Sequence, residues 1–277
     1  MSNEKFSVLM SLYEKELPSN LDECLKSIAY QTLKADEIIL VFDGPIGESL
    51  CEIVKYWDAH LPLRIVRLNV NRGLGEALNY GLNACSNELI VRMDTDDICR
   101  KQRFEKLLSS LTHDKELVLI GSYIEEFSCT EDNITGLRIV PLSHSDIIYK
   151  CKIKNPFNHM SVAFRKSAVI KVGGYMHHLY MEDYNLWLRM ISDGGKVQNL
   201  PEPLVLVRAG GELLRRRRGY KYLMSEIYLS DLKVRLGIQK RLPSLFILLL
   251  RGLPRVLPLS ILKLVYITMR KNKREIV

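Results

Sequence analysis

The chain has 277 residues, of which 47% are hydrophobic and 26% charged, so disorder is excluded as the default and one large α/β domain with a tail is expected. Six scattered cysteines, without a Cys-x-x-Cys pair, are interpreted as thiols in a reducing compartment. The net charge of +8 is uneven, because residues 215–277 carry 16 Lys and Arg against 3 Asp and Glu, and residues 1–214 carry 24 against 29. We therefore predict an acidic body, residues 1–212, and a basic region, residues 213–277, that meets an anionic partner.

The first half of the chain alternates short apolar strands with helices. Its first strand follows the N-terminus so closely that no signal peptide fits, which predicts a cytoplasmic protein. The alternation predicts a parallel sheet covered on both faces, whose ligands bind outside the carboxyl ends of the strands. The predicted strands are at 6–10, 38–42, 63–68 and 89–91. Three helices are predicted: one that begins with a capping box at Ser19–Asp22, one at 48–60, and one that ends at Leu82.

An apolar run, Leu89–Val91, leads directly into three carboxylates. In an extended chain Asp94 and Asp96 point the same way and can face one hard cation, while Asp97 starts the next turn. Oxygen ligands favour Mg²⁺ or Mn²⁺ bound together with substrate phosphates. The alternative is that Asp96 and Asp97 only cap a helix beginning near Arg100. Four loops should converge on one rim of the sheet: Ser11–Tyr13, Asp43–Gly44, Asn71–Gly73 and Asp94–Asp97.

After residue 98 the pattern is less regular, and this half is expected to supply the acceptor side of the site. Glu182 and Asp183 open a helix that ends at Gly194 and Gly195. The other predicted elements are helices at 103–111 and from 143, and strands at 118–120, 137–140 and 161–164.

From Arg215 the chain becomes basic, with a helix predicted to about Leu236 and then apolar clusters mixed with Lys and Arg. The apolar run Leu245–Leu250 is far shorter than the ~20 residues that span a bilayer. Prolines at 243, 254 and 258 are expected to break a long helix. These features favour a basic amphipathic segment on anionic lipid; the alternative is a helical pair packed on the domain.

Five stretches, in this order, resemble the motifs of glycosyltransferase family 2. The resemblance covers roughly residues 6–210 and implies an inverting nucleotide-sugar transferase with a GT-A fold, a Rossmann-like mixed sheet flanked by helices, here with a basic helical tail. The stretches are Ser7–Tyr13, Val41–Gly44, Asn71–Leu74 with Ala77–Leu82, Asp94–Asp97, and Glu182–Arg189.

The resemblance implies how the donor, a UDP-sugar, is held. The first-strand loop and the aspartate after the second strand would bind the base, an arginine would lie near the base or phosphates, and the acid motif would face the ribose and sugar and hold the metal. The base-binding residues would be Ser11, Tyr13 and Asp43, and the arginine would be Arg72. In the acid motif, Asp94 would face the ribose and sugar, and Asp96 would hold the metal. The sequence departs from the family pattern at Phe42 and Pro45, and no histidine follows His178 to complete the metal ligands.

The resemblance also implies one carboxylate that removes the proton of the attacking hydroxyl. Asp183 is the candidate base and Glu182 positions the acceptor or the loop; both lie in the first turn of a helix, whose positive end keeps them ionised. The alternative is that they are ordinary helix caps. The candidate acceptor-binding residues are His159, Trp187, Arg208 and Arg215, the last within the run Arg215–Arg218. The alternatives are a structural histidine, a tryptophan in the core and a solvated basic patch.

A cytoplasmic transferase with a basic end suits a lipid-linked acceptor at the inner leaflet. The pattern resembles bacterial enzymes that add galactose or glucose to a sugar on undecaprenyl diphosphate in O-antigen or exopolysaccharide assembly, with Mn²⁺ or Mg²⁺ as cofactor. Alternatives are a transferase with a soluble or protein acceptor, a retaining transferase, a basic nucleic-acid-binding protein and a nucleotidyltransferase. The nucleic-acid reading lacks a recognition motif, and the nucleotidyltransferase reading lacks glycine between Ser11 and Leu17.

Overall fold

The computed structural model describes residues 4–208 and 219–256, with side chains described up to residue 252. Two compact units are formed, one by Met1–His177 with Glu182–Gly210 and the other by His178–Met181 with Gly211–Val277. The domain boundary predicted between residues 212 and 213 falls outside the described residues. We describe each unit by itself.

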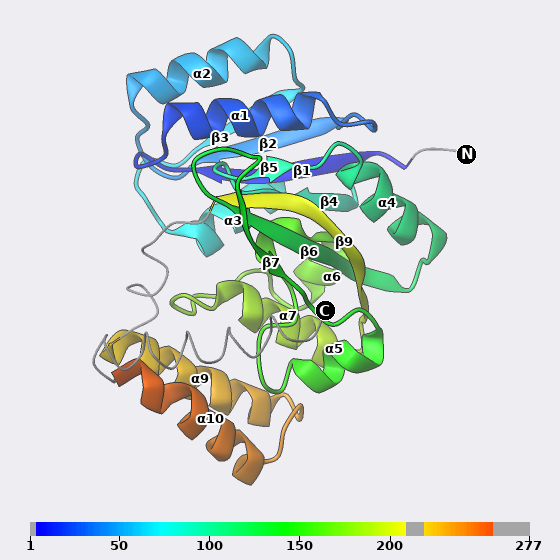
Figure 1. The fold of residues 1–277 in the computed structure, drawn as a ribbon, viewed down its shortest axis with the longest axis vertical. Helices are drawn as coiled ribbons and strands as arrows, with labels where there is room; N and C mark the ends of the chain where they lie inside the picture. Colours follow the sequence, from blue (N-terminus) through cyan, green and yellow to red (C-terminus); the bar gives the residue numbers. More distant parts are fainter. Residues whose placement is uncertain (1–3, 209–218, 257–277) are drawn as a thin grey trace. The chain divides into compact units, whose positions relative to one another are not determined.

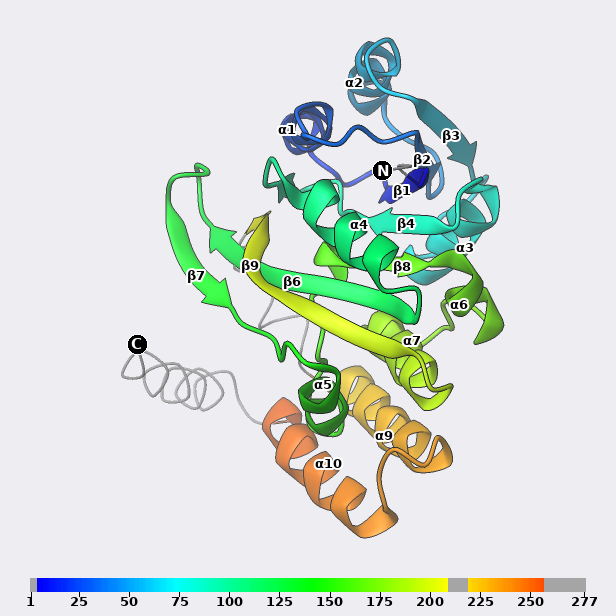
Figure 2. The ribbon, with the colours of Figure 1, turned by 90° about the vertical axis from the view of Figure 1, so that its right-hand side faces the viewer.

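The first unit is built on one mixed sheet, which contains nine strands among the described residues, in the order β3-β2-β1-β4-β8-β6-β9-β5, with β7 paired to β6 (Figure 1; Figure 2). Strands β1 to β4 are parallel to one another, β8 is antiparallel to both β4 and β6, and β6 and β9 are parallel. The strands are β1 Phe6–Leu12, β2 Glu37–Phe42, β3 Leu63–Arg67, β4 Leu89–Arg92, β5 Ile98–Cys99, β6 Leu117–Phe127, β7 Ile134–Arg138, β8 Ala163–Arg165 and β9 Lys196–Arg208.

Helices cover both faces of the parallel part of this sheet, as the apolar strands predict. Alternate residues such as Val8 and Met10 share a buried core with α1 and α2, whereas Leu9 lies against α3. At Gly81 a Cβ atom would lie 2.4 Å from Leu9 Cδ1, so only glycine lets α3 approach the sheet this closely. The helices are α1 Pro18–Ala29, α2 Glu48–Asp58, α3 Leu74–Ala84, α4 Arg103–His113, α5 His144–Lys150, α6 Lys166–Lys171 and α7 Glu182–Ser192, with a 3₁₀ turn at His159–Ser161.

Two local predictions are corrected, and one long strand was not predicted. Helix α1 begins at Pro18, because proline suits the first helical position, so the capping box placed at Ser19–Asp22 is wrong. The strand expected at 161–164 starts at Ala163, after the 3₁₀ turn. Strand β9 has no counterpart among the predicted elements, since Pro201 and Pro203 interrupt its apolar pattern.

The second unit contains a pair of helices, α9 Tyr220–Arg235 and α10 Arg241–Val256. They are antiparallel: Ser230 Oγ lies 2.7 Å from Ser244 Oγ, and Glu226 binds Arg251. Helix α10 continues past two prolines that were expected to break it. The first, Pro243, lies in the opening turn, where its missing N–H is not needed. Among residues 4–208 and 219–256, the structure contains no helix that is both long and apolar enough to span a membrane.

Candidate active site

The carboxyl ends of β1, β2 and β4 bring three of the predicted loops to the same edge of the sheet. In the parallel register Ser11 lies beside Val41, and Leu9 lies beside Arg92. Thr95 Oγ1 donates to the carbonyl oxygen of Ser11 at 3.5 Å, so the acid motif touches the end of β1 directly. The side chain of Tyr13, just beyond β1, is exposed.

Asp43, after β2, holds the loop before α3. Its buried carboxylate accepts the backbone N–H of Arg72 at 2.6 Å and that of Gly73 at 3.0 Å. Gly44 adds to this fit, because a Cβ atom there would lie 2.7 Å from the backbone nitrogen of Asn71, and its φ of +92° favours glycine. Asp43 therefore holds this loop in place. That structural role is additional to the base-binding role predicted for it.

The guanidinium of Arg72 lies along α3. Its Nη1 is 2.7 Å from Glu76 Oε1, one helical turn away, and its Cζ is 5.9 Å from the centre of the Tyr80 ring. The side chain of Arg72 is 44% exposed, so these contacts leave it accessible.

Asp94, Asp96 and Asp97 form one cluster, in which one carboxylate oxygen from each lies within 4.8 Å of the others. The sequence predicted that Asp94 and Asp96 share a side; Asp97 joins them. Asp97 is buried and accepts the backbone N–H of Arg208 at 3.2 Å, which ties the cluster to the end of β9.

Electrostatic strain in this cluster favours a cation. Burial, and then the charges of Asp94 and Glu16, raise the pKa of Asp96. Burial, and then the charges of Asp96 and Asp94, raise the pKa of Asp97. A divalent ion would relieve this repulsion, and carboxylate oxygens are the donors that Mg²⁺ and Mn²⁺ prefer, so the residues present fit such an ion.

Arg92, which sequence reasoning missed, lies under the cluster. It is 1% exposed and forms an ion pair with Asp94, while its Nε and Nη1 make no hydrogen bond within the part of the chain that the structure describes. Burial is the largest single influence and lowers its pKa, but the charge and hydrogen bond of Asp94, together with the charges of Tyr175 and Asp97, outweigh burial and raise the pKa of Arg92. The sequence offered one indication of this role: an arginine directly follows the apolar run Leu89–Val91.

The acceptor-side acid, Asp183, lies in the first turn of α7, as predicted. Its Oδ2 accepts a hydrogen bond from Asn155 Nδ2 at 2.7 Å. Burial raises the pKa of Asp183, although this hydrogen bond and the charge of Arg92 lower it in part. A raised pKa brings a carboxylate closer to the range in which it accepts a proton efficiently.

Tyr175 connects the two groups of acids. Burial raises the pKa of Tyr175, Arg92 lowers it, and the carboxylates of Asp183 and Asp94 raise it further. The hydroxyl of Tyr175 is therefore within electrostatic reach of both acids, which the chain separates by 89 residues (183 − 94). Asn79 of α3 fixes the Tyr175 backbone by accepting its N–H at 2.8 Å and donating to its carbonyl oxygen at 2.7 Å.

Three other residues predicted for the site, His159, Trp187 and Glu182, lie in different surroundings. His159 Nε2 lies 3.0 Å from the Tyr175 hydroxyl, and burial, then Arg92, lower its pKa well below the usual value, so its ring is neutral. Trp187 is 0% exposed, between His159 and Phe157, so it has no face on which a sugar could stack, and the acceptor role predicted for it is wrong. Glu182 packs against Gly75, at the start of α3.

Arg208, at the end of β9, lies beside the acid cluster. Its Nη2 is 2.6 Å from Glu23 Oε2, its Nε donates to the Asp96 carbonyl oxygen at 3.3 Å, and its Cζ is 4.8 Å from the centre of the Phe127 ring. Arg215 and the rest of the run Arg215–Arg218 lie outside the described residues.

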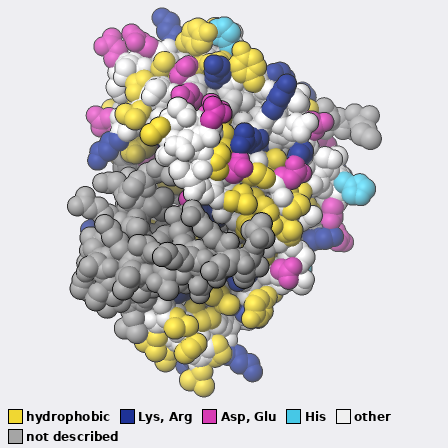
Figure 3. All heavy atoms as spheres, viewed as in Figure 1, with side chains coloured by type: hydrophobic (Ala, Val, Ile, Leu, Met, Phe, Trp, Pro, Cys, Tyr) yellow, Lys and Arg dark blue, Asp and Glu magenta, His cyan; other side chains and the backbone are white. Residues whose placement is uncertain are grey.

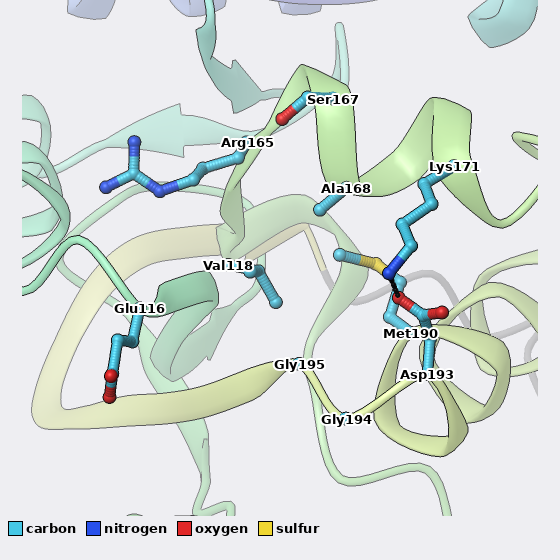
Figure 4. A pocket seen from close by; sticks show the side chains of 10 residues that line it. All are labelled: Glu116, Val118, Arg165, Ser167, Ala168, Lys171, Met190, Asp193, Gly194 and Gly195. Atoms are coloured by element: carbon cyan, nitrogen blue, oxygen red, sulfur yellow. Dashed lines mark ion pairs between the residues drawn. The ribbon is translucent and has the colours of Figure 1, made fainter.

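A separate open groove of about 330 Å³ contains none of these residues (Figure 4). The ion pair between Lys171 and Asp193, at 2.7 Å, crosses one end of it. Its lining is Glu116, Val118, Arg165, Ser167, Ala168, Lys171, Met190, Asp193, Gly194 and Gly195. The candidate site is therefore the rim and not this groove.

A carboxylate cluster suited to a cation, at the carboxyl ends of parallel strands, is compatible with binding a nucleotide diphosphate together with a divalent ion. The chain belongs to glycosyl transferase family 2, whose family model matches residues 7–173. The family resemblance of the sequence is thereby confirmed.

Two relatives extend this assignment. The chain is 48% identical over 267 residues to the amylovoran biosynthesis glycosyltransferase AmsE of Erwinia amylovora, covering 96% of this chain and 100% of that protein. It is 40% identical over 223 residues to an Escherichia coli UDP-Gal:alpha-D-GlcNAc-diphosphoundecaprenol beta-1,3-galactosyltransferase, covering 80% of this chain and 81% of that protein.

The fold is similar to that of S. aureus TarS, residues 1–349, solved in complex with UDP-GlcNAc. The TM-score is 0.66 at 18% identity, and the match covers 91% of this chain and 72% of the other. The predicted GT-A fold is confirmed.

Proposed function

We propose that the protein transfers galactose or glucose from a UDP-sugar to a sugar carried on undecaprenyl diphosphate, with inversion, in O-antigen or exopolysaccharide assembly. The observation that carries this proposal is the cluster of Asp94, Asp96 and Asp97, suited to a cation, together with a second acid, Asp183, whose charge acts on the same Tyr175 as that of Asp94. The galactosyltransferase named above, 40% identical to this chain, supports the substrates by its name.

The donor would bind at the carboxyl ends of β1 and β2. Tyr13 is exposed and Ser11 borders the acid motif, as a base-binding surface requires. Asp43 would act on the base and also through the loop that it fixes. Arg72, held on α3 by Glu76, would supply a positive charge to the base or phosphates.

Asp94 and Asp96 would hold Mn²⁺ or Mg²⁺, which supplies charge stabilisation to the departing diphosphate when bound. Asp96 has the stronger case as ligand, because Asp94 is already paired with Arg92. Asp94 would face the ribose and the sugar from that fixed position. Arg92 keeps Asp94 oriented and adds a permanent positive charge beneath the site.

Asp183 would act as base on the opposite face of the sugar. The acceptor oxygen forms a bond to the anomeric carbon, its proton passes to Asp183, and the bond from that carbon to the UDP oxygen breaks with its electron pair on the diphosphate. Asn155 orients the Asp183 carboxylate for this transfer. Glu182, against the start of α3, would position the loop or the acceptor.

The remaining candidates would act on the acceptor. His159 is neutral and hydrogen-bonded to Tyr175, so this pair can contact a sugar without adding charge. Arg208 and Arg215 would pair with the acceptor diphosphate. A lipid-linked acceptor places the enzyme in the cytoplasm on the inner face of the membrane, whose anionic surface suits the basic C-terminal region.

The test is to incubate the protein with a panel of UDP-sugars, Mn²⁺ and a synthetic GlcNAc-diphosphate-lipid, and to measure the product mass and then the linkage by NMR. A product heavier by one hexose, with a β-linkage, is expected. Transfer only to free sugars or to protein would overturn the assigned acceptor, and an α-linkage would remove the role of Asp183 as base.

A further inference from the structure

The pair of helices α9 and α10 carries an apolar surface that points outward. On α10 the exposed apolar residues recur at helical spacing, which places them on one side. Their exposed fractions are large, and hydrophobic side chains gather at the lower end of the face shown in Figure 3, where α10 lies. The outward stripe of α10 consists of Leu242 (81% exposed), Leu245 (52%), Phe246 (63%), Leu249 (49%) and Leu250 (60%).

Polar groups, in contrast, join the two helices. Ser244 is buried and its hydroxyl donates to the Ser230 carbonyl oxygen at 3.0 Å. Glu226 is buried and binds Arg251 through two contacts of 2.8 Å. In a helix pair that faces water these positions are ordinarily apolar and the outer ones polar. In the pair of α9 and α10, by contrast, the buried Ser244 and Glu226 lie between the helices, whereas the outward stripe of α10 is apolar.

The helices also approach each other through small residues. A Cβ atom at Gly252 would lie 2.8 Å from Leu223 Cδ1, and the two serines pair directly. Small residues and hydrogen bonds between helices are the means by which helices associate where the surroundings are themselves apolar. The seam therefore fits a helix pair whose outer surface lies against hydrocarbon.

The charges of α9 and α10 indicate whether their apolar surface meets a second copy of the protein or a lipid membrane. Residues 219–256 carry 7 Lys and Arg against 2 Asp and Glu, and exposed Lys240 and Arg241 lie beside Leu242 at the start of the stripe. Two copies of this unit would bring like charges together, whereas anionic lipid headgroups would neutralise them. Within the described residues α10 extends over 16 residues, fewer than the ~20 that span a bilayer.

We infer that α10 lies in the plane of an anionic membrane, with Leu242, Leu245, Phe246, Leu249 and Leu250 in the acyl region and Lys240 and Arg241 among the headgroups. This inference rests on the proposed function in one respect: a lipid-linked acceptor gives such a surface its purpose. The inference identifies α10 as the part of the protein that would bring the site to that acceptor.

The test measures sedimentation of the full chain with vesicles of phosphatidylcholine, with and without phosphatidylglycerol. Leu245→Gln/Phe246→Gln/Leu249→Gln should lower the partition constant at least about tenfold. Lys240→Gln/Arg241→Gln should chiefly remove the preference for phosphatidylglycerol. The matched control is Ile134→Gln/Leu137→Gln/Ile139→Gln, three apolar residues of the first unit that are 41%, 54% and 53% exposed and should bind as the wild type does.

A second measurement does not require the triple variant to fold. Phe246→Trp should show quenching by brominated lipid above that of the unchanged protein, which already contains Trp57 and Trp187. Equal sedimentation of triple variant and wild type, or no additional quenching, would overturn the inference. So would a wild-type dimer in analytical ultracentrifugation that the triple variant turns into monomer without any vesicle binding.

The two proposals fail in different ways. Hexose transfer to a water-soluble, short-chain acceptor should be unchanged in the triple variant, because its substitutions lie outside the site. If the wild type binds vesicles but transfers no hexose, the proposed function fails and the membrane surface stands. If it transfers hexose to the soluble acceptor but ignores vesicles, the membrane surface fails and the transferase stands.

Discussion

The donor side and the acceptor side of the candidate site are held in place by different means. On the donor side, backbone groups do most of the positioning: Asp43 binds two consecutive N–H groups, and the acid cluster follows a strand in parallel register. On the acceptor side, side chains distant in sequence meet, as in the bonds of Asn155 to Asp183 and of His159 to Tyr175. The donor side is therefore set by the fold, and the acceptor side by individual contacts.

The largest effect is expected at the base. Asp183→Asn cannot take up the proton of the acceptor, so kcat should fall by about 10²- to 10⁴-fold while UDP binding, measured by calorimetry, stays unchanged. Asp193→Asn, at the far end of α7 in an ion pair with Lys171, is the matched control and should remain active. Normal turnover in the Asp183 variant would exclude it as base.

Next comes the cation site. Asp96→Ala should abolish the dependence of UDP affinity on Mn²⁺, because it removes the ligand that is not already paired with an arginine. Titration of UDP with and without Mn²⁺ measures this. Glu16→Gln is the control. Glu16 raises the pKa of Asp96 and accepts a hydrogen bond from Thr95 Oγ1 at 3.0 Å, but it does not belong to the acid cluster, so this variant should keep the Mn²⁺ dependence. A Mn²⁺ effect of normal size in the Asp96 variant would refute the ligand assignment.

Asp43 tests whether backbone positioning governs the donor side. Asp43→Asn retains one acceptor oxygen but turns an amide donor toward a backbone N–H, which should cost about 2 kcal/mol of unfolding free energy in urea and weaken UDP binding. Exposed Asp132→Asn should change neither quantity. Weakened UDP binding without lost stability would assign Asp43 to the base alone.

The smallest effect concerns the pH profile. The hydrogen bond from Asn155 lowers the pKa of Asp183, so Asn155→Ala should raise that pKa further. Since the base must be ionised, the acidic limb of kcat/KM should move to higher pH, and the plateau above it should fall because Asn155 also orients the carboxylate. Exposed Asn133→Ala is the comparison. A limb that moves to lower pH would show that another group controls it.

The same contrast explains what could be predicted from the sequence. The donor loops were located correctly at strand ends because each is a short motif that follows an apolar strand, and Glu182 and Asp183 were placed in the first turn of α7 by local pattern alone. Tyr175 and Asn155 were missed, because their importance comes from partners far along the chain. Arg92 was missed although its partner, Asp94, is only two residues away, because the motif was interpreted from its carboxylates alone. Trp187 was misplaced because helical spacing cannot tell a core aromatic from a surface one.

The close packing of α3 at Gly81 has a consequence for both substrates. This helix begins directly after the loop that Asp43 fixes, and its Asn79 holds the backbone of Tyr175. An added methyl group at Gly81 would lie 2.4 Å from Leu9 Cδ1 and 2.7 Å from Val41 Cγ2, so either these buried side chains or α3 itself would have to shift. The absence of a side chain at Gly81 thus helps to set the distance of α3 from the sheet, and with it the positions of the Asp43 loop and of Tyr175, neither of which Gly81 contacts.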